Sequence, residues 1–96
     1  MNNIVNNIYN AQFSYHLTNL KARIDAWPNT RMKRELQTKL LYIERLSQLT
    51  NDDYMLMLCA LKKMKLSALE FDLCVYCLKG LTTYSLHRYR LSEESL

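Results

Sequence analysis

Three cysteines and two histidines are the side chains of this sequence with the chemistry for metal binding or redox reactions. Cys74 and Cys77 form a C-x-x-C pair, a spacing that occurs in zinc sites and in redox motifs. A zinc site needs two further ligands, and the remaining candidates, Cys59, His16 and His87, are scattered along the chain. The pair also lies within a helical pattern and not in a turn. We therefore expect buried, reduced thiols without metal, and keep an enzyme or metal protein built on the pair as an alternative.

Residue patterns typical of enzymes are not found in this sequence. It has no phosphate-binding loop, no paired carboxylates suited to acid–base catalysis, and no Ser or Cys nucleophile beside a base. Asp52 and Asp53 follow Thr50, where acidic residues suit the first turn of a helix. We interpret His16, which flanks Tyr15 on the predicted polar side of the first helix, as a surface or interface residue. The sequence predicts a protein that is not an enzyme and needs no cofactor.

Length and composition indicate one helical domain, residues 1–96. A single Gly and a single Pro leave too few turn residues for an all-β fold. The net charge of +4 is compatible with nucleic-acid binding without being diagnostic of it. No apolar run is long enough to cross a membrane, no signal peptide is recognised, and the odd cysteine count favours reduced thiols. We expect an all-α bundle of four to five helices in the cytoplasm, without a membrane partner.

Capping signals divide the chain into successive helices. Pro28 ends the first helix, and Asn29 or Thr30 is placed to cap the next. The core helices are predicted within residues 31–64, and the part after Thr50 is apolar around much of its circumference. This segment, 51–64, is therefore expected to be the central core helix. A further start signal, with capping-box spacing, lies at Ser67.

The opening segment, 4–27, is predicted to form a long amphipathic dimerisation helix with two apolar stripes. One stripe contains Ile4, Ile8, Ala11, Tyr15 and Ala22. The other contains Val5, Tyr9, Phe13, Leu17, Leu20, Ile24 and Trp27. Because the combined face is wider than a surface helix requires, we expect one part to face the chain's own core and another a second chain. The predicted dimer contacts are Ile4, Ile8, Tyr9, Phe13, Tyr15, Leu17, Leu20 and Ile24. The alternative is a core helix of a small bundle.

The C-terminal part, 67–91, carries a pattern typical of the turn and second helix of a helix-turn-helix. Gly80 is followed by an aliphatic residue, a Ser/Thr, two free positions, a second Ser/Thr, an aliphatic residue, one free position and Arg88. Gly80 would allow a sharp turn, and the following helix would present its N-terminal residues to DNA. Tyr76 departs from the pattern, which usually has a small residue there. The alternative is a helical hairpin with an arginine-tipped end. The candidate DNA-binding residues are Thr82, Thr83, Tyr84, His87, Arg88 and Arg90.

Several short motifs are shared with one known family. They are Ile8-Tyr9-Asn10, Ser14-Tyr15-x-Leu17 and Lys21, and, more loosely, Leu49-Thr50 and Leu69-Glu70-Phe71-Asp72. At these residues the chain resembles FlhD, the smaller subunit of the bacterial flagellar activator FlhDC, whose relatives also occur in mobile genetic elements. The resemblance implies an all-helical homodimer that assembles with a larger, zinc-holding FlhC-like subunit, helps to bind promoter DNA and recruits RNA polymerase.

The resulting expectation is a subunit of a transcriptional activator that acts as a dimer with an FlhC-like partner. The alternative is a helical protein-interaction subunit without DNA binding, such as a chaperone or an anti-activator of phage or plasmid origin. The two alternatives share wide apolar helices, but only the first needs the basic C-terminal end.

Overall fold

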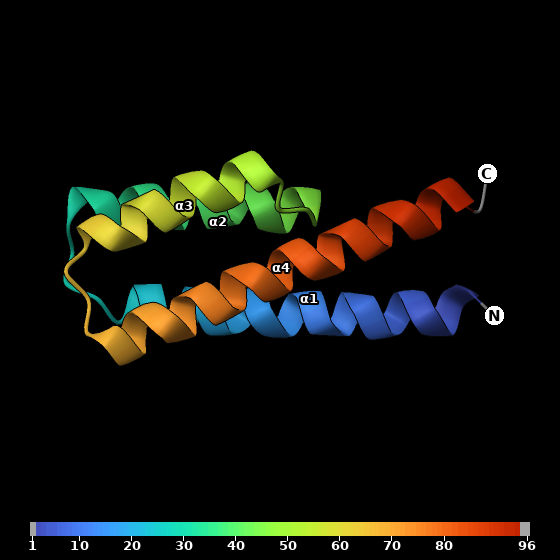
Figure 1. Ribbon diagram of the computed structural model, residues 1–96, viewed down its shortest axis with the longest axis horizontal. Coiled ribbons are helices and arrows are strands. Elements are labelled where there is room, and N and C mark those ends of the chain that lie inside the picture. Colours follow the sequence, from blue (N-terminus) through green and yellow to red (C-terminus); the bar gives the residue numbers. More distant parts are fainter. Residues whose placement is uncertain (1, 95–96) are drawn as a thin grey trace.

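The computed structural model describes the backbone of residues 2–94 and the side chains of residues 8–85. Four helices follow one another: α1 (Asn2–Asp25), α2 (Arg31–Leu46), α3 (Asn51–Lys63) and α4 (Ala68–Glu94), with no strand in the described part. Helices α1 and α4 run antiparallel along the length of the molecule, and the shorter α2 and α3 lie beside them (Figure 1). The molecule measures 44 × 21 × 19 Å. The predicted all-α bundle is confirmed.

Three side chains cap the helices at the positions that the sequence indicates. The hydroxyl of Thr30 accepts from the N–H of Lys33 (3.2 Å), and that of Thr50 accepts from the N–H of Asp53 (3.1 Å). Ser67 caps α4 by accepting from the N–H of residue 70 (3.2 Å). Each bond satisfies an N–H group that has no partner within its helix, so the helix starts are encoded locally.

The helix ends depend less on local residue type. Helix α1 ends at Asp25, three residues before Pro28, as expected. By contrast, Ser47 and Lys65 adopt positive φ angles of 53° and 54°, although neither is the glycine that usually occupies this conformation. These two residues redirect the chain after α2 and after α3, and the sequence pattern did not indicate them.

The core is built mainly on the pair α1 and α4, which form the most extensive helix–helix interface. Buried side chains from all four helices fill it; they are Phe13, Leu17, Leu20, Ile24, Trp27, Leu36, Leu40, Ile43, Leu49, Met57, Leu61, Cys74, Cys77, Leu78 and Leu81. The prediction that the 51–64 helix is the central core element is wrong. Only Met57 and Leu61 of α3 are buried, whereas Met55 and Leu56 are largely exposed.

The predicted turn at Gly80 is also wrong, and with it the separate fifth helix and the hairpin. Helix α4 continues from Ala68 to Glu94, and no glycine has a positive φ. A glycine is required at this position for a different reason. A Cβ atom at Gly80 would lie 2.4 Å from Cδ2 and Nε2 of His16 on α1, far inside van der Waals contact. Gly80 therefore allows α1 and α4 to approach closely.

Polar contacts fasten the α2–α3 hairpin to the long helices. The N–H of Leu49, between α2 and α3, donates to the hydroxyl of Ser85 on α4 (2.8 Å), and both residues are buried. An ion pair of 2.8 Å joins Lys21 on α1 to Glu44 on α2. Among the residues that the structure describes, no helix meets the length and hydropathy needed to cross a bilayer.

Candidate interaction surfaces

The two apolar stripes of α1 have opposite environments. Of the second stripe, Phe13, Leu17, Leu20, Ile24 and Trp27 are buried in the chain's own core, and Tyr9 is half-buried. Of the first stripe, Ile8, Ala11, Tyr15 and Ala22 are exposed. Ile4 and Val5 lie outside the residues whose side chains are described. Thus one part of the wide face covers the core, and the other faces away from it.

This division corrects the predicted dimer contacts. Phe13, Leu17, Leu20 and Ile24 are at most 6% exposed and pack within the chain, so they are core residues of the bundle. Ile8 and Tyr15 remain accessible, at 55% and 59%. The apolar face of α1 is wide, and its periodicity alone does not say which of its two edges the other helices cover. The dimer contacts were therefore predicted on both edges.

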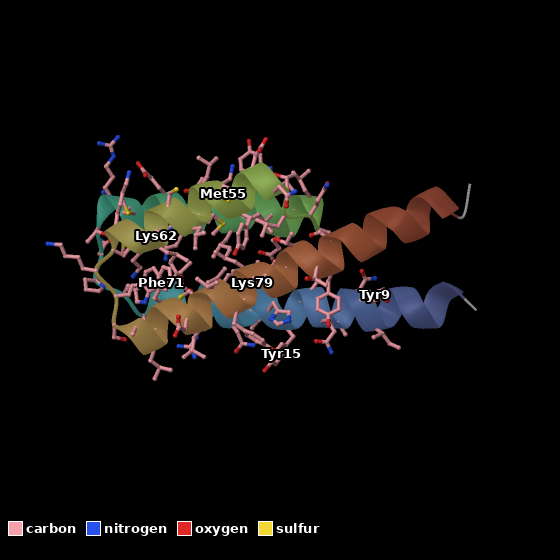
Figure 2. The ribbon with its side chains drawn as sticks, viewed as in Figure 1. Tyr9, Tyr15, Met55, Lys62, Phe71 and Lys79 are labelled. Carbon is pink, nitrogen blue, oxygen red and sulfur yellow. The ribbon has the colours of Figure 1, made fainter. Side chains whose placement is uncertain are left out.

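Helix α4 extends the exposed apolar stripe of α1. Tyr76 is exposed, and its ring and that of Tyr15 both contact the imidazole of His16 edge-on, with centroids 5.2 and 5.5 Å away. Leu69, also exposed, lies two helical turns before Tyr76 on the same side of α4. We call the surface formed by Ile8, Tyr15, Leu69 and Tyr76 the α1–α4 face. Tyr15 projects from the side of the molecule opposite to α2 and α3 (Figure 2).

His16 lies beneath this face and not on the surface, so its predicted surface or interface position is wrong. Its imidazole is 4% exposed, is stacked on Tyr84 with centroids 5.8 Å apart, and covers Gly80. Its Nδ1 atom has no hydrogen-bond partner among the described residues. Burial lowers the pKa of His16, because the charged imidazolium is disfavoured away from water. The neutral ring therefore acts as a packing element between α1 and α4.

Two of the candidate DNA-binding residues contact their own chain. The Thr82 hydroxyl donates to the carbonyl of Leu78 one turn earlier (3.0 Å), and Tyr84 packs on His16 and on Tyr9 of α1. Thr83 is exposed. His87, Arg88 and Arg90 lie outside the residues whose side chains are described. The outward array expected of a recognition helix is thus not formed by Thr82 and Tyr84.

A second exposed apolar surface lies on the α2–α3 hairpin, and the sequence reasoning missed it. It consists of Leu41, Tyr42, Leu46, Met55 and Leu56, which are between 56% and 65% exposed. We call it the α2–α3 face. Met55 lies on α3, across the molecule from Tyr15 (Figure 2). The signal in the sequence was the apolar residues outside the main stripe of each helix. Those of the 51–64 segment were interpreted as part of a central core helix.

The cysteines have the environments expected of unreactive thiols, with one exception. Cys74 and Cys77 are buried. Burial raises the pKa of Cys74 to about 12, with a further contribution from the Glu70 charge, and burial also raises the pKa of Cys77. Cys59 is exposed on α3. Within the described residues, no three His, Cys, Asp or Glu side chains are grouped as a metal site would require.

An open cleft of about 830 Å³ lies where the end of α1 meets the start of α4. The carboxylate of Glu70 in its wall accepts from Arg23 (2.9 Å) and from the indole N–H of Trp27 (3.3 Å). Because these polar groups already satisfy one another, they serve to join α1 to α4. Lys65 also lines the cleft and has no ion pair among the described residues, but no second polar group beside it is shown to await a ligand.

Comparisons with protein-family models, with curated proteins and with solved structures find no match to this chain. The surfaces described above are therefore the basis for inferring a function.

Proposed function

We propose that the chain is the small, dimer-forming subunit of an FlhD–FlhC-type transcriptional activator of the bacterial cytoplasm. In this proposal the α1–α4 face pairs with a second copy, and promoter DNA is bound only together with a larger FlhC-like subunit. The observation that carries the proposal is the exposure of Ile8 and Tyr15 on a helix whose second stripe is buried from Phe13 to Trp27. Large apolar side chains exposed together on one side of a molecule are typical of a protein interface.

The shape of α4 determines how DNA would be contacted. Because α4 is continuous through Gly80, the helix-turn-helix predicted around this residue is not formed in the described part of the chain. The basic residues Arg88 and Arg90 would then contact phosphates, adding affinity and salt dependence but little sequence specificity. Specific recognition is accordingly assigned to the partner, which would also take part in recruiting RNA polymerase.

The test is promoter binding with and without the partner. The protein and the product of a neighbouring FlhC-like reading frame are titrated, separately and together, into labelled DNA from upstream of their own operon, and anisotropy is recorded at several salt concentrations. We expect weak, salt-dependent binding by the lone chain and specific binding by the mixture. The double variant Ile8→Ser, Tyr15→Ser should weaken the mixture, whereas Asn10→Ser, at an exposed polar residue of α1 that belongs to neither the α1–α4 face nor the α2–α3 face, provides the matched control. Tight, specific binding by the lone chain would contradict the proposal.

A second candidate is favoured by the same continuous α4. Since the predicted helix-turn-helix is not formed around Gly80, the chain could act through its apolar faces alone, as a chaperone or anti-activator that never touches DNA. Reversing the charge at Arg88 and Arg90 to glutamate separates the two candidates. A regulator subunit should lose promoter affinity while keeping its partner, and a pure interaction subunit should keep its function unchanged.

A further inference from the structure

The α2–α3 face differs in charge from one end of the hairpin to the other. Its apolar residues, Leu46 and Met55 among them, lie near the connection between the two helices. Lys62 and Lys63 lie at the opposite end of α3, beside the start of α2, which carries Arg34. Figure 2 shows Met55 and Lys62 at different points along α3. The face is thus apolar at one end and basic at the other.

The basic end is not neutralised by the chain itself. Within the described part of the hairpin, the acidic side chains Glu35, Glu44 and Asp53 are already paired with Arg31, Lys21 and Lys39. Within the hairpin, residues 31–63, the exposed cations without an ion pair are Arg34, Lys62 and Lys63 at this end and Arg45 at the other. The one exposed anion of the hairpin without an ion pair, Asp52, also lies at the other end. The excess positive charge beside an apolar patch indicates what kind of surface would complement it.

We propose that the α2–α3 face docks an amphipathic helix of a partner protein, with apolar anchors on the Leu46–Met55 end and acidic residues on the Lys62–Lys63 end. A helix laid on two neighbouring helices would cover the exposed apolar side chains in the way that helix-in-groove complexes do. Nucleic acid is a poorer fit, because it would leave the apolar end uncovered. A membrane surface is also a poorer fit, because interfacial helices carry their apolar stripe along their whole length.

This docking site rests on the proposed function, which requires a partner protein, and its peptide binding is tested separately from dimerisation. The probe is a synthetic amphipathic helical peptide with leucines at helical spacing and a glutamate run at one end. Its twin carries lysines in place of the glutamates. Binding is followed by anisotropy of the labelled peptide. A second readout is the rate at which iodoacetamide alkylates Cys59, which is exposed on α3 one turn from Met55, while Cys74 and Cys77 are buried.

We expect the glutamate peptide to bind at least about ten-fold more tightly than its lysine twin and to slow alkylation of Cys59. The variant Leu46→Ser, Met55→Ser should lower the affinity about ten-fold or more. Lys62→Glu with Lys63→Glu should reverse the preference between the peptides. The matched control is Ile8→Ser with Leu69→Ser, exposed residues of the α1–α4 face; it should leave peptide binding intact even if it abolishes dimerisation.

Three results would overturn this inference. The first is equal affinity for the two peptides, which would show unspecific adhesion. The second is slower alkylation of Cys59 in the presence of phosphatidylserine–phosphatidylcholine vesicles or of a DNA duplex, while neither peptide slows it. That result would make a membrane or a nucleic acid the occupant of the face. The third is a lower molecular mass of the protein itself in the Leu46→Ser, Met55→Ser variant, which would make a second copy the occupant. Loss of the dimer in the α1–α4 control, with peptide binding kept, would leave the inference standing.

Discussion

Replacing Gly80 by alanine tests the close approach of α1 and α4. Alanine in the middle of an ordinary helix is about 1 kcal/mol more favourable than glycine. At this position the new Cβ would lie 2.4 Å from the His16 ring, roughly 1 Å closer than ordinary carbon–carbon contact. The ring is held between Tyr76 and Tyr84 and has little room to move.

Such overpacking costs about 1–3 kcal/mol, so we expect Gly80→Ala to lower the free energy of unfolding by about 1 kcal/mol after the gain in helix propensity. In a His16→Ala background the clash is absent. There Gly80→Ala should instead raise the free energy of unfolding by about 1 kcal/mol. The coupling between the two sites in a double-mutant cycle is therefore about 2 kcal/mol.

The assay is urea unfolding followed by circular dichroism at 222 nm, with all four proteins of the cycle compared at a fixed concentration. Stabilisation by Gly80→Ala in both backgrounds would refute the close contact with His16. Destabilisation by the same amount in both backgrounds would instead indicate a left-handed Gly80, because that penalty is independent of His16. The sign in the His16→Ala background thus separates a packed helix from a turn.

Two further substitutions and the pH dependence of stability test the contacts that organise the bundle. Ser85→Ala removes the buried acceptor of the Leu49 N–H and should lower the free energy of unfolding, measured by urea denaturation, by about 1–3 kcal/mol. An unchanged free energy of unfolding would contradict the importance of this hydrogen bond. Thr50→Ala removes the cap of α3 and should cost about 1 kcal/mol, whereas Thr50→Ser should cost little. Stability should also depend on pH through His16. Since its pKa is lowered by burial, the unfolded chain binds a proton that the folded chain disfavours. Stability is therefore full above about pH 6.5 and falls as the pH drops below it, by at most about 1.4 kcal/mol per pH unit, and His16→Gln should flatten this slope. Asp53, whose pKa is lowered by hydrogen bonds from Lys39 and Thr50 against the opposing effect of burial, contributes stability that is lost only near and below its ordinary pKa of 3.8.

Local signals in the sequence were sufficient to locate the starts of α2, α3 and α4. Thr30, Thr50 and Ser67 each cap the helix that follows them, because an N-cap depends only on residues three positions apart. The stop before Pro28 is local for the same reason. The all-α class followed from these signals together with the helical periodicity of the apolar residues.

Gly80 shows where local reasoning was insufficient. A glycine followed by threonines is typical of a turn, and nothing nearby in the sequence indicates otherwise. Its actual role depends on His16, which is 64 positions away in the chain and close in space only after α1 and α4 have packed. A glycine required by a tertiary contact and a glycine required by a turn look alike in a single sequence.

The interaction surfaces were predictable in kind but not in detail. The width of the apolar stripe on α1 indicated an extra exposed face, and Ile8 and Tyr15 lie on it. Which edge of the stripe is covered depends on the placement of α4. The apolar residues of α3 were assigned to the core for a similar reason, although Met55 and Leu56 face away from it. The orientation of a helix about its own axis is set by its neighbours, which periodicity does not specify.

The molecular mass in solution tests the central claim most directly. We expect sedimentation equilibrium of the 11.4 kDa chain to give twice that mass, and the Ile8→Ser, Tyr15→Ser variant to give the mass of a single folded chain with unchanged helix content. A wild-type protein that remains a single chain at high concentration would contradict the claim that the α1–α4 face pairs two copies. A dimer that is unaffected by the double substitution would contradict it equally.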